Sequence, residues 1–203
     1  SDEFLQVATT HRYAALEGSV FIHPFADRRM IAANGTIGLE ILEDLPNVDS
    51  VIIPFGGGGL ATGIATAIKG RKRDTRVYGC ETETAAPLAA SFAAGSVQAV
   101  KRVPSFVDGI GAENVLPEMW ELVQPLLEGS IVVSLREIVS AIALLFERNR
   151  VIAEGAGAAS VAAALSGKAG TGRVVCVVSG GNIDFSKLLR EPTARTRTLK
   201  KQA

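Results

Sequence analysis

Three observations in the sequence predict an α/β fold, namely an open, mostly parallel twisted sheet with helices on both faces. Short runs of β-branched residues alternate with longer segments of helical periodicity, which is the order typical of parallel sheets. The short runs are apolar along nearly their whole length, as expected for strands covered on both faces. Glycine-rich turns follow several of them directly. The 203 residues suffice for one well-buried domain, or for one large domain with the remnant of another.

The predicted strands and helices alternate along the chain. The strands are Val20–His23, Ser50–Pro54, Arg76–Cys80, Ser130–Val133 and Val174–Val178. The helices, which carry apolar residues at helical spacing, are Arg28–Leu45, Leu60–Lys69, Thr84–Ala94, Leu135–Arg150 and Ala156–Leu165. Gly70 and Gly95 mark two of the helix ends. The stretch from 96 to 114 breaks the pattern, and a long loop of this kind is more often functional than ordinary.

Composition excludes several classes of partner. Acidic and basic residues balance at 21 each, so no global charge favours nucleic acid or an anionic membrane. No apolar stretch reaches the roughly 18 to 20 residues that span a bilayer, and the charged N-terminus lacks the apolar core of a signal peptide. The predicted location is the cytoplasm. Cys80 and Cys176 lie in apolar runs, which indicates buried free thiols and no disulfide framework.

The strongest local signal is Gly56–Leu60, four glycines and a leucine that follow a predicted strand and open a helix. We call this segment the glycine loop. Glycines let the backbone turn tightly, and the helix adds unpaired N–H donors and the positive end of its dipole. The loop therefore predicts a phosphate site, because a tight turn alone rarely needs four consecutive glycines.

The glycine loop alone leaves the ligand open. It is not a Walker loop, because no Gly-Lys-Ser/Thr follows. Gly56, Gly58 and Ala61 meet the dinucleotide spacing, and Glu81 ends the next strand, where a ribose-binding acid could lie. A run of four glycines meets that spacing almost by default, so the match carries little weight.

Three further motifs contain residues suited to a ligand site. Ser179–Asn182, which we call the serine turn, follows the last strand and can present a hydroxyl without crowding; a capped strand-to-helix turn explains it equally well. Glu154 precedes a run of glycine and alanine at a helix start, where stabilisation of the helix terminus is the simpler explanation. Val107–Gly111 carries Asp108 and Gly109, which allow close backbone approach or form an ordinary turn.

Together and in this order, the four motifs resemble those of the serine/threonine dehydratase group of pyridoxal-phosphate enzymes, which share a fold with tryptophan synthase β chains. His23–Phe25 before a helix and Asn34–Glu40 (NGTIGLE) also fit. The resemblance runs from the first residues to about Arg190. It implies the large cofactor domain of the tryptophan synthase β-like fold.

The resemblance also implies roles for individual residues. The glycine loop would bind the phosphate of pyridoxal 5′-phosphate, and Ser179 would hydrogen-bond the pyridine nitrogen, which in this family favours β-elimination. Gly109, with Asp108, would lie beside the cofactor ring or the substrate, and Glu154 near the ring. The implied cofactor-binding residues are Gly56, Gly57, Gly58, Gly59, Leu60, Gly109, Glu154 and Ser179.

The implied activity is that of a lyase which deaminates L-threonine or L-serine, small-molecule amino acids, to a 2-oxo acid and ammonia. Family members commonly form dimers, so a homodimer is expected of the full-length protein. The family's catalytic lysine, in a Ser-x-Lys-type motif, is not found in this sequence, and neither is its upstream asparagine loop. We therefore assign no catalytic residue and expect a C-terminal fragment that is inactive alone.

The expected division is a remnant of a small N-terminal domain with a crossover over 1–25, the cofactor domain over 26–191, and a basic tail over 192–203. Some relatives bind a divalent cation through a glutamate, a backbone carbonyl and an aspartate. Glu81 and Ala85 match the first two, but Pro87 stands where the aspartate would be, so no metal site is predicted.

Two alternatives remain open. The residues fit an amino-acid racemase or a β-replacement enzyme of the same fold, and a racemase needs a second acid/base group on the opposite face of its substrate. The non-enzymatic alternative is a regulatory module that binds a phosphate-bearing ligand or a nucleotide through the same glycine loop.

Overall fold

A four-stranded parallel sheet organises the protein. The structure, a computed structural model, describes residues 21–184 and 186. The strands are β1 (Ser50–Pro54), β2 (Arg76–Thr82), β3 (Gly129–Val133) and β4 (Val174–Cys176). Their order in the sheet is β3-β2-β1-β4, and every pairing is parallel. The first and last of the described strands are therefore neighbours, with Ile52 opposite Cys176.

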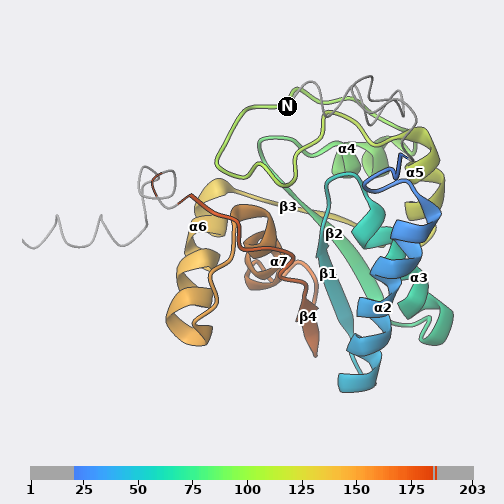
Figure 1. The fold of residues 1–203 in the computed structure, drawn as a ribbon, viewed down its shortest axis with the longest axis horizontal. Helices are drawn as coiled ribbons and strands as arrows, with labels where there is room; N and C mark the ends of the chain where they lie inside the picture. The colour runs from blue at the N-terminus through green and yellow to red at the C-terminus, as the bar shows by residue number, and fades with distance from the viewer. Residues whose placement is uncertain (1–20, 185, 187–203) are drawn as a thin grey trace, which may run out of the picture.

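Helices cover both faces of the sheet (Figure 1). α2 (Arg28–Asp44) and α3 (Gly59–Arg71) lie on one face, and α6 (Leu135–Leu144) and α7 (Gly155–Leu165) lie on the other. The other helices in the described part of the chain are α4 (Pro87–Ala94), α5 (Pro117–Val123) and η2 (Leu145–Asn149), a π-helical turn that continues α6. The predicted fold class is therefore confirmed, with helices on both faces of an open parallel sheet.

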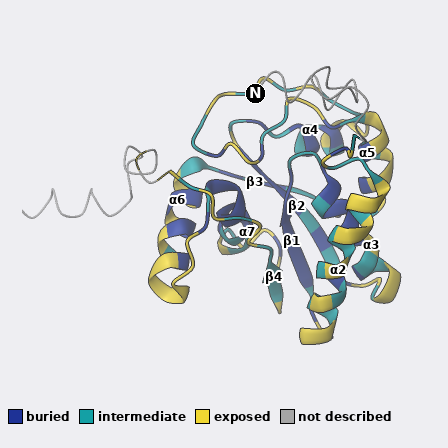
Figure 2. Cartoon of the chain, viewed as in Figure 1, coloured by how far each residue is buried: buried dark blue, intermediate teal, exposed yellow. Residues whose placement is uncertain are grey.

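The central strand β1 separates two apolar cores. All five of its residues are buried (Figure 2). Their side chains alternate between the two faces of the sheet. Val51 and Ile53 pack in the core under α3, whereas Ile52 packs in the core with α7. The edge strand β4 is only half-buried along its length.

Four predicted strands are confirmed, with small changes at their ends, whereas the prediction for Val20–His23 is wrong for its described residues. Phe21–His23 belong to no strand, and a turn follows over 24–26. The reason is local, because Nδ1 of His23 accepts hydrogen bonds from the N–H groups of Phe25 and Ala26 and so stabilises a turn.

The predicted helices are present, with differences at their ends. α3 runs through Gly70 to Arg71, and α4 begins only at Pro87, because proline is well suited to the first helical turn. Gly95 ends α4 with φ +70°, as its prediction as a C-cap requires. The α5 helix was not predicted. It lies just after the long loop over 96–114 and also begins at a proline, Pro117.

Both cysteines are free thiols, as predicted, although only Cys80 is fully buried and Cys176 is half-buried on the edge strand. Among the described residues, no helix combines the length and apolarity needed to cross a membrane. The predicted tail over 192–203 and most of the segment 1–25 lie outside the described residues.

Candidate functional site

The glycine loop lies where the central strand ends. After β1, the N–H of Phe55 still bonds to the carbonyl of Cys80, at 2.9 Å, and the loop then turns into α3. Gly58 is the N-cap of α3 and has φ +94°, a left-handed conformation that favours glycine. The first helical turn therefore stands at the carboxyl end of the sheet, which is where ligands bind in open α/β folds.

The loop presents unused hydrogen-bond donors. Within the described part of the chain, no acceptor takes the backbone N–H groups of residues 56 to 61, and the first intrahelical bond runs from Thr62 N–H to the Gly58 carbonyl, at 2.8 Å. Gly58 and Gly59 are buried. Buried N–H groups are rarely left unpaired, and here they coincide with the positive end of a helix dipole. This arrangement fits a phosphate group.

Close packing on the loop explains why glycines occupy it. A Cβ on Gly57 would overlap the ring of Phe25, and one on Gly59 would lie 2.5 Å from the Phe25 carbonyl oxygen. Glycine is therefore required here for close approach as well as for turning. His23 and Phe25 are the residues that the sequence analysis did not assign to the site; their only signal was the His-Pro-Phe motif before α2.

The other predicted motifs converge on the glycine loop. A Cβ on Gly56 would lie 3.4 Å from the carbonyl oxygen of Gly109, and a Cβ on Gly109 would lie 3.6 Å from Oε2 of Glu154. Glu154 in turn contacts the serine turn, since its N–H donates to the Gly180 carbonyl at 3.0 Å. Its Oε1 lies against Gly180, at the position that a Cβ there would occupy. The structure thus brings all four motifs together in one continuous line of contacts.

The serine turn is held against the N-terminus of α7. A Cβ on Gly157 would lie 2.5 Å from the Gly180 carbonyl oxygen. One turn further along α7, Oγ of Ser160 donates to the Val177 carbonyl at 2.8 Å. Ser179 itself is exposed and follows the last described strand at the same end of the sheet.

The carboxylate of Glu154 lies in an unfavourable environment for its charge. Burial raises the pKa of Glu154 above the ordinary value of 4.5, and the nearby Asp108 charge raises the pKa further. Glu154 occupies the N-cap position of α7, but its side chain makes no capping hydrogen bond. Instead the two oxygens of its carboxyl group lie next to Gly109 and Gly180.

Glu81 does not face this site. Its side chain is 1% exposed and accepts hydrogen bonds from Leu88 N–H and Ala89 N–H, both at 2.8 Å, and from Oγ of Ser130 at 2.7 Å. Burial raises the pKa of Glu81, and these hydrogen bonds, which lower the pKa, offset only part of that increase. The carboxylate thus stabilises the start of α4. Because its carboxylate is bonded in this way, Glu81 is not placed to bind a ribose or a cation at this site. The described residues contain no group of His, Cys, Asp and Glu side chains suited to a metal ion.

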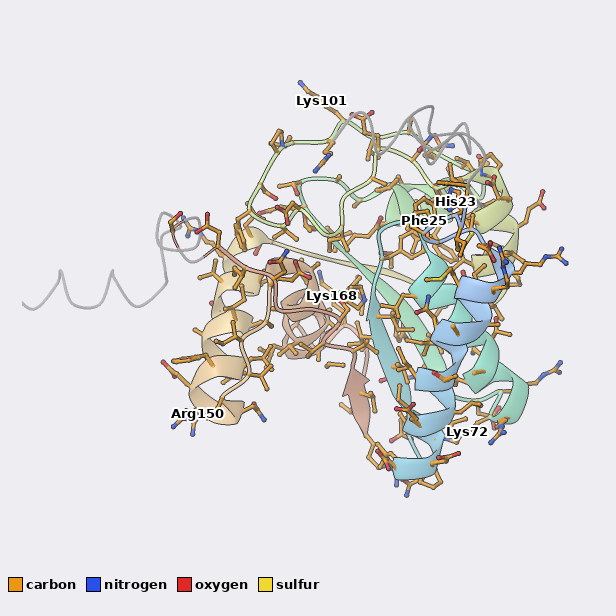
Figure 3. The ribbon with its side chains drawn as sticks, in the orientation of Figure 1. His23, Phe25, Lys72, Lys101, Arg150 and Lys168 are labelled. Atoms are coloured by element: carbon orange, nitrogen blue, oxygen red, sulfur yellow. The ribbon has the colours of Figure 1, made fainter. Side chains whose placement is uncertain are left out.

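The side chains of the four described lysines bind other groups or extend away from the protein. Lys69 pairs with Glu128 at 3.0 Å, Lys72 donates to the Val48 carbonyl, and Lys168 donates to the Val132 carbonyl at 3.4 Å. Lys101 is exposed and extends outward from the long loop (Figure 3). None of these four lysines is among the nearest neighbours of the glycines in the loop.

Comparison with known proteins identifies the family. The family model described as "Pyridoxal-phosphate dependent enzyme" matches residues 2–180. This chain belongs to that family. The family is defined by its dependence on pyridoxal phosphate, so the cofactor of this chain is pyridoxal 5′-phosphate.

Individual relatives agree with this assignment. The chain is 43% identical over 174 residues to an L-threonine ammonia-lyase of Thermotoga maritima, covering 85% of this chain and 43% of that protein. It is 41% identical over 186 residues to the catabolic L-threonine dehydratase of Escherichia coli K12, covering 90% and 56%. The chain thus spans about half the length of the curated relatives it matches. The structure of maize serine racemase superimposes with a TM-score of 0.78 at 32% identity, covering 92% of this chain and 58% of that one.

Proposed function

We propose that this chain forms the cofactor-holding part of a pyridoxal-phosphate-dependent ammonia-lyase that deaminates L-threonine or L-serine to a 2-oxo acid and ammonia. One observation carries the proposal: four motifs far apart in sequence meet at one end of the sheet, in contact from Gly56 through Gly109 and Glu154 to Gly180. In this proposal the cofactor domain occupies residues 26–191, and no residue of this chain is assigned as catalytic.

The glycine loop binds the phosphate in this proposal. The N–H groups of Gly56, Gly57, Gly58, Gly59 and Leu60 have no acceptor among the described residues and are available as donors. Several N–H groups and a helix dipole bind a dianion without a basic side chain, so the phosphate charge is balanced by fixed dipoles. Such fixed donors also orient the rest of the bound molecule.

At the other end of the site, Ser179 forms a hydrogen bond with the pyridine nitrogen in this proposal. A hydroxyl can donate to an unprotonated ring nitrogen, whereas a carboxylate would favour the protonated form. Glu154 positions the serine turn through its N–H bond to Gly180, and Gly109 leaves room beside the ring. When bound, pyridoxal phosphate supplies the electron sink for breaking bonds at the α-carbon of the substrate.

The names of the relatives favour threonine as the substrate, because both curated matches above act on L-threonine. The similarity to maize serine racemase supports a second candidate, an amino-acid racemase. The full-length protein distinguishes them by its products. We expect a 2-oxo acid and ammonia from L-threonine and L-serine; D-serine formed from L-serine without loss of ammonia identifies a racemase.

Binding by the full chain tests the site directly. Titration with pyridoxal 5′-phosphate and with inorganic phosphate, followed by calorimetry, gives separate affinities for the two ligands. We expect Ser179→Ala to weaken pyridoxal phosphate binding about tenfold, by loss of one hydrogen bond, and to leave phosphate binding unchanged. Because Ser179 is exposed, the free energy of unfolding of the Ser179→Ala variant should stay within about 0.5 kcal/mol of that of the wild type.

The assignment of the glycine loop fails if the wild-type chain binds neither ligand. A preference for nucleotides over pyridoxal phosphate instead supports the regulatory-module alternative.

The proposal also includes a homodimer for the full-length protein and a cytoplasmic location. Light scattering of the purified full-length protein tests the first, and cell fractionation tests the second.

A further inference from the structure

The turn over 23–26 lies directly on the glycine loop. The ring of Phe25 occupies the space that a side chain on Gly57 would need. The backbone of the same residue covers Gly59, whose Cβ would lie 2.5 Å from the Phe25 carbonyl oxygen and 2.8 Å from its Cα. One residue therefore contacts two of the four glycines, through its side chain and through its main chain.

His23 fixes the conformation of this turn. Its Nδ1 accepts hydrogen bonds from the N–H of Ala26 at 2.9 Å and from the N–H of Phe25 at 3.3 Å. A ring nitrogen that accepts these bonds carries no proton, so the neutral ring has its proton on Nε2. The imidazole also packs edge-on against the Phe25 ring, with centroids 4.4 Å apart and planes at 87° (Figure 3). Since His23 is 5% exposed, this arrangement is buried.

The turn is anchored on its other side by two tightly packed helices. α2 starts immediately afterwards, with Asp27 as its N-cap accepting from Arg29 N–H at 2.8 Å. A Cβ on Gly38 of α2 would lie 2.7 Å from the Ile64 carbonyl oxygen of α3, so the two helix backbones are in near contact. The loop that opens α3 and the turn that precedes α2 are thus fixed relative to each other.

We infer that His23 and Phe25 are positioning residues that hold the glycine loop in its phosphate-binding conformation. Four consecutive glycines have large conformational freedom, and ordering them during binding would weaken the affinity. A loop that is already ordered by a packed aromatic ring avoids this loss. The inference rests on the proposed phosphate site, and it adds that the affinity of the site depends on residues that do not touch the ligand.

A purely structural role for Phe25 makes a different prediction. If the ring only filled space, its removal would lower the stability of the protein and leave the affinity for phosphate unchanged. Phe92 provides a matched control, because it is also a half-buried phenylalanine packed edge-on against an aromatic ring, that of Trp120, with centroids 5.2 Å apart. No glycine of the loop has Phe92 among its nearest neighbours.

The experiment compares Phe25→Ala, Phe25→Leu and Phe92→Ala in the full chain. Calorimetric titration with inorganic phosphate and with pyridoxal 5′-phosphate gives the affinities, and urea unfolding gives the stabilities. We expect Phe25→Ala to raise both dissociation constants by the same factor, about tenfold. The reason is that the variant must order the glycine loop when the ligand binds, and the free-energy cost of this ordering weakens the affinity by about that factor. Phe25→Leu, which keeps apolar bulk, should show a smaller rise, and Phe92→Ala none.

His23 allows a test by conservative rescue. Asn can place its amide oxygen near the position of Nδ1 and accept the same two N–H groups, whereas Ala cannot. His23→Ala should therefore weaken phosphate binding several-fold, and His23→Asn should restore most of it. Amide hydrogen exchange over residues 56–60 should become faster in His23→Ala and in Phe25→Ala, but not in Phe92→Ala.

The two proposals fail in different ways. Wild-type affinities that are unchanged in Phe25→Ala and in Phe25→Leu overturn the positioning role and leave the phosphate site intact. A wild-type chain that binds neither ligand overturns the proposed site, and the positioning role with it. If Phe25→Ala does not fold, Phe25→Leu and the two His23 variants still decide the question through affinity and exchange.

Discussion

The two ends of the candidate site are built from very different parts of the sheet. The glycine loop follows β1, which is buried at all five positions and pairs with strands on both sides. The serine turn follows β4, an edge strand of three half-buried residues, and Ser179 itself is exposed. One end is thus enclosed by the core, whereas the other lies at its margin.

The contacts that hold the two ends differ in the same way. At the glycine loop, the atoms nearest to the Cβ positions of Gly57 and Gly59 belong to the ring and the main chain of Phe25, which have little freedom to move. At the serine turn, the atom nearest to Gly180 is the end of the flexible Glu154 side chain. The comparison indicates that the glycine loop is held by groups with little freedom to move, whereas the serine turn is contacted by a side chain that can adjust.

The largest effect should come from a methyl group added at the rigid end. Gly57→Ala places a Cβ into the Phe25 ring, and we expect overpacking to lower the free energy of unfolding by about 2 kcal/mol and to abolish measurable phosphate binding. Gly70→Ala is the control, because Gly70 lies in α3, the helix that follows the glycine loop, and nothing lies within 4 Å of its Cβ position. It should be neutral or stabilising by up to about 1 kcal/mol. Urea unfolding and phosphate titration measure both variants. Equal free energies of unfolding for the two variants would contradict the view that the glycine loop is rigidly packed.

A smaller effect is expected from the same change at the margin. Gly157→Ala directs a methyl group at the Gly180 carbonyl oxygen, 2.5 Å away, but the edge strand can shift to accommodate it. We expect a loss of about 1 kcal/mol in the free energy of unfolding, with weaker pyridoxal phosphate binding and unchanged phosphate binding. Calorimetric titration with the two ligands separates these outcomes. A parallel loss of phosphate affinity would show that the two ends are coupled and not independent.

The smallest effect concerns the pH dependence of stability. Burial and the Asp108 charge raise the pKa of Glu154 in the folded protein, so the folded state binds this proton more tightly than the unfolded chain. The stabilisation is present at low pH and is lost as the pH rises through the raised pKa. Glu154→Gln should remove this decline, and Asp108→Asn should reduce it by less, because burial is the larger cause.

Urea unfolding at several values between about pH 4 and about pH 7 measures this slope. The effect is small because the carboxyl group is partly solvated. Identical slopes in the wild type and in Glu154→Gln would show that the charge of Glu154 is not strained in the folded protein. No titratable side chain lies in the glycine loop itself, so a change in the loop should leave the slope unaltered.

Sequence patterns predicted the sheet and its helices well, because β1, β2 and the helix of Arg28–Asp44 have clear periodicity and clear ends. They also singled out the four motifs that the structure brings into contact. They did not predict that Glu81 points into the protein, since its partners Leu88, Ala89 and Ser130 come from a helix start and another strand. A residue's direction at the end of a strand depends on such tertiary contacts.

The same limit applies to the contact between Phe25 and the glycine loop. A His-Pro-Phe motif looks like an ordinary turn, and Phe21–His23 even continue an apolar run that resembles a strand. Only the packing of α2 on α3 brings this turn against Gly57 and Gly59. The glycines could be read as a phosphate loop from their number and position, but the residue that keeps them in place could not.

The strand order has a consequence for the time at which the site forms. β1 pairs with β2 soon after both have been synthesised, so the glycine loop and α3 can become ordered while the rest of the chain is still being made. β4 pairs with the same strand β1 but comes last in the sequence, and a contact so distant along the chain forms slowly. Until it forms, β1 keeps one bare apolar edge, open to pairing with other chains. The serine turn, which follows β4, should therefore become ordered later than the glycine loop, and the pairing of β4 closes the bare edge of β1 against other chains.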